Sequence, residues 1–175
     1  MQQQVTFPQP LGPGQSISHA LPMGVSPGFV NASVAPNLGL QVAIKNLTSG
    51  EVLYYQSDLE LPAIFTEAGG LEKTDFINMW KGISEANEHY FSLPTGAARS
   101  VDAVADLLKL SNVFYVAKRG IDGKEIAYFS VKTMTNVVAL FEFTFDGSGA
   151  TKVCLKTEQK AFCGVLQKSL ELLFA

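Results

Sequence analysis

The stretch WKGISEANE, residues 80–88, contains the residues of this chain whose types could form a recognition site. Trp80 is the only tryptophan among 175 residues, and acidic side chains follow it at Glu85 and Glu88. An indole offers a large flat surface to an apolar side chain, and carboxylates can hold a cationic group. The same pattern is also typical of a core anchor at the end of an amphipathic helix. Two interpretations, a structural tryptophan and an aromatic pocket ringed by charge, are therefore open at this point.

Catalytic residue patterns do not emerge from the sequence. The two histidines, His19 and His89, stand in unlike contexts without a Ser or Cys in a recognisable nucleophile setting, so no triad can be read. The usual sequence signatures of nucleotide, phosphate and zinc sites are absent. Glu85 and Glu88 could in principle exchange protons, but most such pairs are solvated surface. We therefore predict that the chain is not an enzyme and has neither cofactor nor metal site.

Composition and charge argue against several other classes of protein. Apolar residues make up 47% and charged residues 17%, with a net charge of −3, which is typical of a globular, mildly acidic chain. A nucleic-acid binder would need a basic stripe to neutralise phosphates, so we predict no nucleic-acid partner. No apolar run approaches the roughly 18 residues that span a bilayer, and MQQQVTFPQP lacks the features of a signal peptide. We expect a soluble, intracellular protein whose Cys154 and Cys163 are reduced, buried thiols.

The first of two predicted parts, residues 1–56, consists of irregular chain followed by a β remnant. Residues 1–38 contain six of the eight prolines and predict extended or irregular structure. After them LGLQVAIKN, residues 38–46, alternates apolar and polar side chains as a half-buried strand does. A turn containing Gly50 then leads to EVLYYQ, residues 51–56, which predicts a hairpin.

The second predicted part, residues 57–175, has the pattern of an α+β domain. In residues 71–83 apolar side chains recur at i, i+3, i+4 and i+7, the spacing of one helical face, and Trp80 belongs to that face. The expected strands are 59–67, 88–93, 112–119, 124–132, 137–145 and 151–157, and the expected helices are 71–83, 101–110 and 158–175. This order predicts a mainly antiparallel sheet with helices that cover one of its faces.

Side-chain alternation divides the two central strands between a buried face and a second face. In residues 137–145 the phenylalanines share one face, and Glu142 must point to the other. In residues 124–132 Tyr128 points away from the face of Phe129. A carboxylate and a tyrosine could thus both lie on an exposed sheet face. That arrangement is also structurally ordinary, since an antiparallel sheet often has one wet side.

Several stretches of the sequence together resemble a known family. The sequences FTEAGGLEKTDFINMWKGISEANE and SNVFYVAKRGIDGKEIAYFSVK, with the closing strand and helix, are similar to the C-terminal appendage of beta-adaptin, the beta subunit of clathrin adaptor complexes. The similarity runs from about Leu38 to the C-terminus. Its most specific pieces are the acidic-glycine turn before the helix, the W-K-x-I-x-x-x-N-E run and the V-x-x-[IV]-A-K-R strand. In this family an immunoglobulin-like sandwich precedes a platform of sheet and helices. The resemblance implies that residues 57–175 are the platform and that residues 1–56 are the incomplete or irregular end of the sandwich.

The resemblance also implies a function. The platform of this family binds short helical peptides of endocytic accessory and cargo-adaptor proteins in a shallow groove, where aromatic side chains take apolar residues and acids engage an arginine. Carried over position by position, the groove residues of this chain are Trp80, Tyr128, Glu88, Glu142 and Lys73. The implied partners are such peptides, the rest of the adaptor complex and clathrin. The implied location is the cytoplasmic surface of coated vesicles, at Golgi or plasma-membrane coats, without a transmembrane segment in this chain.

Two other functions remain open in the sequence. A similar platform would suit an appendage of the coatomer coat with different ligands. Unpaired strands in residues 1–56 would also suit a structural fragment that associates with itself. A second peptide site of the family, on the sandwich, would place its aromatic side chain near Tyr54 or Tyr55, but most of the sandwich is missing. Because a shallow groove holds only a few anchor residues, we expect peptide binding to be micromolar or weaker.

Overall fold

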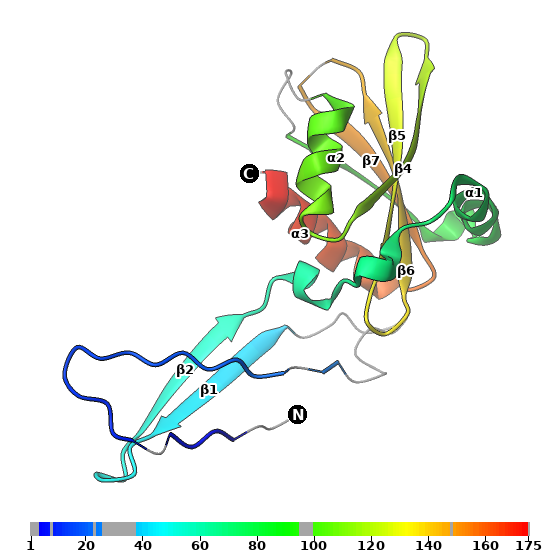
Figure 1. The fold of residues 1–175 in the computed structure, drawn as a ribbon. Helices are drawn as coiled ribbons and strands as arrows, with labels where there is room; N and C mark the ends of the chain where they lie inside the picture. The colour runs from blue at the N-terminus through cyan, green and yellow to red at the C-terminus, as the bar shows by residue number, and fades with distance from the viewer. Residues whose placement is uncertain are drawn as a thin grey trace.

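The computed structural model describes residues 4–7, 9–22, 24–25, 38–94, 100–147 and 149–174. Their strands and α-helices are β1 (Gly39–Lys45), β2 (Val52–Asp58), α1 (Lys73–Gly82), β3 (Glu88–Leu93), α2 (Val101–Lys109), β4 (Phe114–Ile121), β5 (Lys124–Lys132), β6 (Val138–Phe145), β7 (Thr151–Thr157) and α3 (Cys163–Phe174). Short 3-10 helices are η1 (Leu61–Ile64), η2 (Glu67–Gly69), η3 (Glu85–Asn87) and η4 (Lys160–Phe162). A five-stranded sheet with helices and a separate two-stranded sheet confirm the predicted α+β class (Figure 1).

The larger sheet is antiparallel throughout, with the strand order β3-β7-β6-β5-β4. Hairpins join β4 to β5, β5 to β6 and β6 to β7, so four of the five strands follow one another along the chain. The turn between β4 and β5 has positive φ at Asp122 (50°) and Gly123 (74°). This geometry suits an Asp-Gly hairpin turn, whose twist matches that of the two strands. Local turn chemistry therefore favours the pairing of β4 with β5, in which Ala117 lies opposite Tyr128.

The inner face of this sheet carries the main core. Phe129, Phe141 and Phe143 have no exposed surface and pack in one cluster with residues of α2 and α3, such as Leu108 and Leu166. The parity predicted for the two central strands is therefore confirmed, since every second side chain of each strand enters this cluster.

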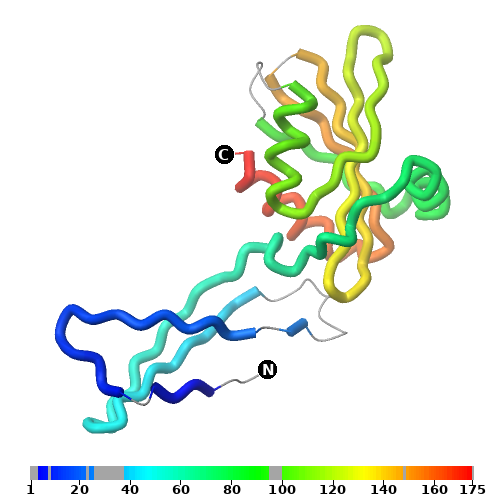
Figure 2. Tube along the Cα trace, in the orientation of Figure 1, coloured from blue at the N-terminus to red at the C-terminus, as the bar shows by residue number. Residues whose placement is uncertain are grey.

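Helix α1 lies on the opposite face of the sheet from α2 and α3 (Figure 2). Its Phe76 is buried with Ile83 and with Leu140 of β6, and the half-buried Trp80 and Tyr128 pack against this second cluster. The expectation that helices cover one face thus holds for α2 and α3 but not for α1. The physical reason is that the outward row of the sheet contains apolar side chains that need cover, and the apolar stripe of α1 supplies it.

The expected strand at residues 59–67 is wrong, because the chain forms η1 and η2 there. Pro62 lies in the first turn of η1, where its missing N–H costs nothing, and the described β pairing of this segment is one isolated bridge between Phe65 and Thr133. The glycine turn then passes tightly against the sheet. A Cβ at Gly69 would lie 2.8 Å from the backbone nitrogen of Lys132, and the Ser130 hydroxyl donates to the Gly69 carbonyl at 2.8 Å. After this contact the chain continues on the outer face of the sheet, where α1 begins.

The N-terminal part consists of a lone hairpin and irregular chain in the residues that the structure describes. Strands β1 and β2 pair antiparallel over seven residues each, as predicted, and residues 4–7, 9–22 and 24–25 contain neither helix nor strand. Nearly every residue of the hairpin is exposed. The part of the predicted irregular region at 26–37 lies outside the described residues. The boundary at residue 56 and the assignment to a sandwich stay predictions.

Candidate functional site

Three aromatic rings form a cluster where α1 crosses the outer face of the sheet. The Trp80 ring stacks on Phe76, with centroids 5.5 Å apart and planes 19° apart. Phe76 in turn meets Tyr128 of β5 edge to face, at 5.4 Å and 63°. Phe76 is buried, whereas Trp80 and Tyr128 are half-buried. The sequence leaves open whether Trp80 is a core residue or part of an exposed aromatic pocket. The structure shows features of both, because the indole packs on the buried Phe76 and is itself only half-buried.

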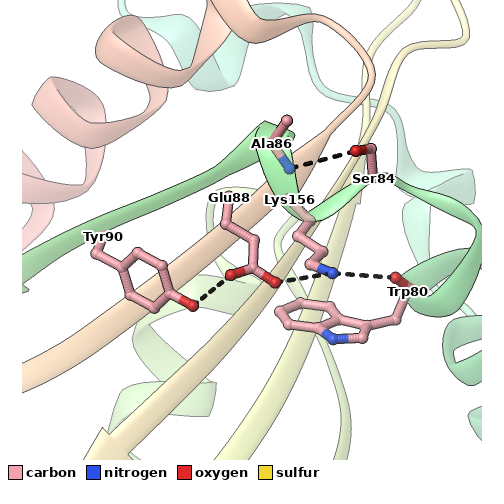
Figure 3. A network of polar contacts seen from close by, with 6 residues as sticks. All are labelled: Trp80, Ser84, Ala86, Glu88, Tyr90 and Lys156. Carbon is pink, nitrogen blue, oxygen red and sulfur yellow. Dashed lines mark hydrogen bonds and ion pairs between the residues drawn. The ribbon is translucent and has the colours of Figure 1, made fainter.

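Lys156 of β7 contacts both Trp80 of this aromatic cluster and Glu88 of the neighbouring strand β3 (Figure 3). Its side chain is only 5% exposed, and its Nζ lies 2.9 Å from Oε1 of Glu88. The same Nζ donates to the Trp80 carbonyl at 3.4 Å and lies 5.0 Å from the centroid of the indole ring. A buried ammonium group is costly unless it is paired, and here a carboxylate, a carbonyl and an aromatic face surround it. Lys156 therefore joins β7, β3 and the end of α1 at one point.

Glu88 is engaged through both of its carboxylate oxygens. Lys156 holds Oε1, and the hydroxyl of Tyr90, two residues along β3, donates to Oε2. These contacts, with the Tyr90 hydrogen bond first and the Lys156 ammonium second, hold the pKa of Glu88 below its ordinary value. The same hydrogen bond raises the pKa of Tyr90, because the phenol proton is held by a carboxylate. Glu88 is thus an ionised group with one partner at each carboxylate oxygen.

Glu142 lies in a more open environment on β6. Its Oε2 is 3.6 Å from Nη2 of Arg119 on the edge strand β4, and the guanidinium carbon lies 5.5 Å from the centroid of the Tyr128 ring. The Arg119 side chain is 54% exposed and that of Glu142 is 27% exposed. Burial, followed by a hydrogen bond with Glu142, raises the pKa of Tyr128 to about 12. This second ion pair is longer and wetter than the pair of Glu88 and Lys156.

Strand register explains how these side chains come together. Tyr90, Cys154, Glu142 and Tyr128 are successive partners across β3, β7, β6 and β5, so they form one row on the outer face. Cys154 is a free, buried thiol, and its burial raises its pKa to about 11. Cys163 is also free and buried, as predicted.

Four of the five predicted groove residues lie in this region. Trp80, Tyr128, Glu88 and Glu142 surround the meeting of α1 with the outer face. Lys73 is exposed at the first turn of α1, and no hydrogen bond or ion pair of the described residues joins it to the other four.

Sequence reasoning missed Lys156, Arg119 and Tyr90. Alternation places Lys156 on the face of Cys154, which was a usable signal. Its pairing with Glu88, however, depends on β3 lying beside β7, two strands that are far apart in the sequence.

The region can bind apolar and charged side chains, but it contains no recognisable nucleophile with an adjacent base. Among the described residues, no group of three or more His, Cys, Asp or Glu side chains is placed to hold a metal ion. No helix in the described ranges is both long and apolar enough to cross a membrane. Its described side chains offer aromatic rings and ion pairs, which can contact apolar and charged groups.

Comparison with known proteins supports the resemblance seen in the sequence. The chain is 31% identical over 133 residues to AP-1 complex subunit beta-1 of Mus musculus and of Homo sapiens, which covers 76% of this chain and 14% of each relative. It is 27% identical over 162 residues to AP-1 complex subunit beta of Dictyostelium discoideum, which covers 91% of this chain and 17% of that relative. The chain thus spans less than a fifth of the length of these relatives. Residues 66–174 match the family model of the beta2-adaptin appendage C-terminal sub-domain, and the chain belongs to this family.

Proposed function

We propose that this chain is the appendage of an adaptor beta subunit and recruits other proteins to a vesicle coat by binding short helical peptides beside α1. The family match and the names of the relatives, AP-1 complex beta subunits, support an adaptor role over the coatomer alternative. The observation that carries the proposal is that the half-buried Trp80 and Tyr128 both pack on the buried ring of Phe76. Large aromatic rings that pack on the core with one side and expose the other side to solvent are typical anchors of peptide interfaces.

The proposed ligand is an amphipathic helix. Apolar residues one turn apart on such a helix would cover Trp80 and Tyr128, and basic residues would face the acidic side chains of the site. Lys73 would meet the peptide at the other end of α1, where its cation is free to contact an acid. Few anchors and exposed ion pairs favour micromolar affinity, and many appendages on one coat would supply avidity. The wider partners, namely the rest of the adaptor complex and clathrin, and the location on coated vesicles belong to this proposal.

One titration tests the proposal directly. Since Trp80 is the only tryptophan, its fluorescence reports on the site without any label. A synthetic helical peptide of the Fxx[FL]xxxR type should change this fluorescence and shift backbone amides of α1 and β5 in NMR spectra. Trp80→Ala removes the fluorescence reporter, so its titration is followed by the amide shifts alone, and these should show no peptide binding. The half-buried position limits the loss of folding free energy to about 1–2 kcal/mol.

Leu172→Ala serves as the matched control for that titration. Leu172 is 76% exposed on α3, on the other side of the sheet, so its loss should leave binding unchanged. Amide shifts that cluster away from α1, for example on β1 and β2, would contradict the proposed site.

Self-association is a second candidate function, favoured by the hairpin. One face of the hairpin carries Val42, Ile44, Leu53 and Tyr55, each between 41% and 58% exposed. An isolated two-stranded hairpin is marginally stable, so a second copy of the chain could cover this face. Light scattering over a range of concentrations separates the two functions, because a monomer at every concentration would remove self-association.

A further inference from the structure

A pocket of about 400 Å³ lies at one end of the sheet, where β6 begins, β7 ends and the last turn of α1 comes close to both. Its apolar wall includes Met79, Ile83 and Val138, and its polar wall includes Thr157, Glu158 and Gln159. None of the five predicted groove residues lines it. A volume of this size is enough for a small ligand or for one long side chain of a partner.

The pocket is separate from the aromatic cluster. Val138 is the first residue of β6, four positions before Glu142, which corresponds to about 13 Å of strand. Met79 and Trp80 are successive residues of α1, so their side chains point about 100° apart around the helix axis. The helix thus turns Met79 toward the pocket, whereas Trp80 contacts Lys156.

Hydrogen bonds hold the walls of the pocket in place. The Thr157 hydroxyl donates to the Val138 carbonyl at 2.9 Å and accepts from the Gln159 amide at 3.3 Å. In the turn between β5 and β6, which also lines the pocket, the Thr133 amide donates to the Val137 carbonyl at 2.9 Å. Because these walls are ordered before a ligand arrives, little further ordering is needed on binding.

Gln159 contributes a hydrogen-bond acceptor that has no partner among the described residues. Its Oε1 atom is shielded from solvent, and no donor of the described chain reaches it. A buried acceptor without a donor is costly, so a ligand that supplies an N–H group would remove this cost. The last side-chain torsion of a glutamine has a broad energy profile, so the oxygen can turn to meet such a donor.

Glu158 adds a negative charge next to this acceptor. Its side chain is exposed, and none of the ion pairs between described residues involves it. A carboxylate and an amide oxygen together favour a cationic N–H donor. The apolar wall of Met79, Ile83 and Val138 favours a hydrocarbon stem below that cation. Lysine combines both features, since four methylene groups carry a compact ammonium group with three donors.

We propose that this pocket binds a lysine side chain of a partner protein, with the alkyl stem against Met79, Ile83 and Val138 and the ammonium group between Gln159 and Glu158. The pocket is additional to the proposed peptide site beside Trp80, and the proposal does not depend on that site. A single side chain makes few contacts, so an isolated lysine should bind with roughly millimolar affinity.

Amide NMR spectra of the whole chain test the proposal with two matched probes. N-acetyl-lysine methylamide carries the ammonium group, and N-acetyl-norleucine methylamide has the same four side-chain carbons without it. The lysine probe should shift the amides of Gly82, Val137 and Gln159 and bind about tenfold more tightly than the norleucine probe. Equal affinities would overturn the proposal, because the ammonium group would then contribute nothing.

Substitutions of the two acceptors separate their roles. Glu158→Gln should weaken the lysine probe about threefold, as expected for an exposed ion pair. Gln159→Met keeps the length of the side chain but removes the acceptor, and it should weaken the lysine probe about tenfold. Gln159→Glu should instead strengthen it, because a second carboxylate then faces the cation. If Gln159→Met does not fold, the opposite effects of Glu158→Gln and Gln159→Glu decide the assignment.

Asp106→Asn is the matched control for the loss of a negative charge. Asp106 is exposed on α2, on the other side of the sheet, so its substitution should leave the affinity of the lysine probe unchanged. A loss in Asp106→Asn equal to that in Glu158→Gln would overturn the proposal, because it would indicate a general effect of net charge.

Competition with the helical peptide of the proposed function distinguishes the two sites. That peptide should leave the lysine probe bound, and the two ligands should shift different amides. Displacement of the probe, or probe-induced shifts at Trp80 and Tyr128 in place of the pocket, would overturn the proposal. A lysine probe that does not bind would also overturn it, and in that case the proposed peptide function stands on its own test.

Discussion

The two faces of the five-stranded sheet use the same strands for different purposes. On the inner face Phe129, Phe141 and Phe143 are fully buried beneath α2 and α3. On the outer face α1 covers only part of the sheet, and Tyr128 and Glu142 remain partly open to solvent. A single alternation of side chains can thus build a core on one side and a recognition surface on the other. Substitutions on the inner face should therefore lower the free energy of unfolding more than those on the outer face, which should also affect the proposed peptide binding.

The largest effect on stability is expected from the inner face. Phe143 contacts the rings of Phe129, Phe141 and Phe174, with centroids 4.9 to 6.4 Å away. Phe143→Ala should lower the free energy of unfolding by about 4 kcal/mol, because it removes a fully buried ring and leaves a cavity. Urea denaturation measures this loss, and a value below about 1 kcal/mol would contradict the assignment of this face to the core.

On the outer face the largest effect should come from Lys156→Met. Its removal leaves Glu88 without its cation, but water can reach that carboxylate, so we expect a loss of about 2 kcal/mol rather than that of a fully buried pair. The double variant with Glu88→Gln should recover part of this loss in the same urea experiment. If the double variant is less stable than the sum of the two single variants, the pair is not the source of the effect.

A smaller effect should appear as a difference in acid sensitivity. The pKa of Glu88 is lower in the folded chain than its ordinary value of 4.5, because Tyr90 and Lys156 stabilise the carboxylate. Its contribution to stability is therefore fully present above pH 4.5 and is lost as the pH falls through the lowered pKa. Glu88→Gln should be less stable than the unmodified chain at neutral pH, and this difference should shrink below pH 4.5 in thermal melts. A difference independent of pH would show that the carboxylate charge is not involved.

The smallest effect on stability is expected for Arg119→Gln. Its ion pair is long and exposed, so the free energy of unfolding should change by no more than about 0.5 kcal/mol. Chemical denaturation with matched salt measures it. A loss comparable with that of Lys156→Met would show that the two ion pairs do not differ in their contribution to stability.

Prediction from sequence succeeded where the evidence is local. The strands around Phe129 and Phe141 follow from period-two alternation and short turns. The start of α2 follows from a serine, because Ser100 accepts a hydrogen bond from the Ala103 amide at 3.2 Å as an N-cap residue does. It failed at residues 59–67, where the apolar residues enter the core from short 3-10 helices that contain Pro62. A run of apolar residues shows that a segment is buried without specifying its backbone conformation.

Apolar spacing alone is sufficient to place Trp80 on one face of a helix and Glu142 away from the buried face of its strand, since both follow from regular backbone periodicity. No such periodicity states which face of the sheet receives α1, because that choice depends on the tight passage of Gly69 beside Lys132. The pairing of Glu88 with Lys156 likewise requires β3 to return beside β7. The folding of the whole chain sets these contacts between distant segments, and they decide here that Glu88 pairs with a buried cation and Glu142 with an exposed one.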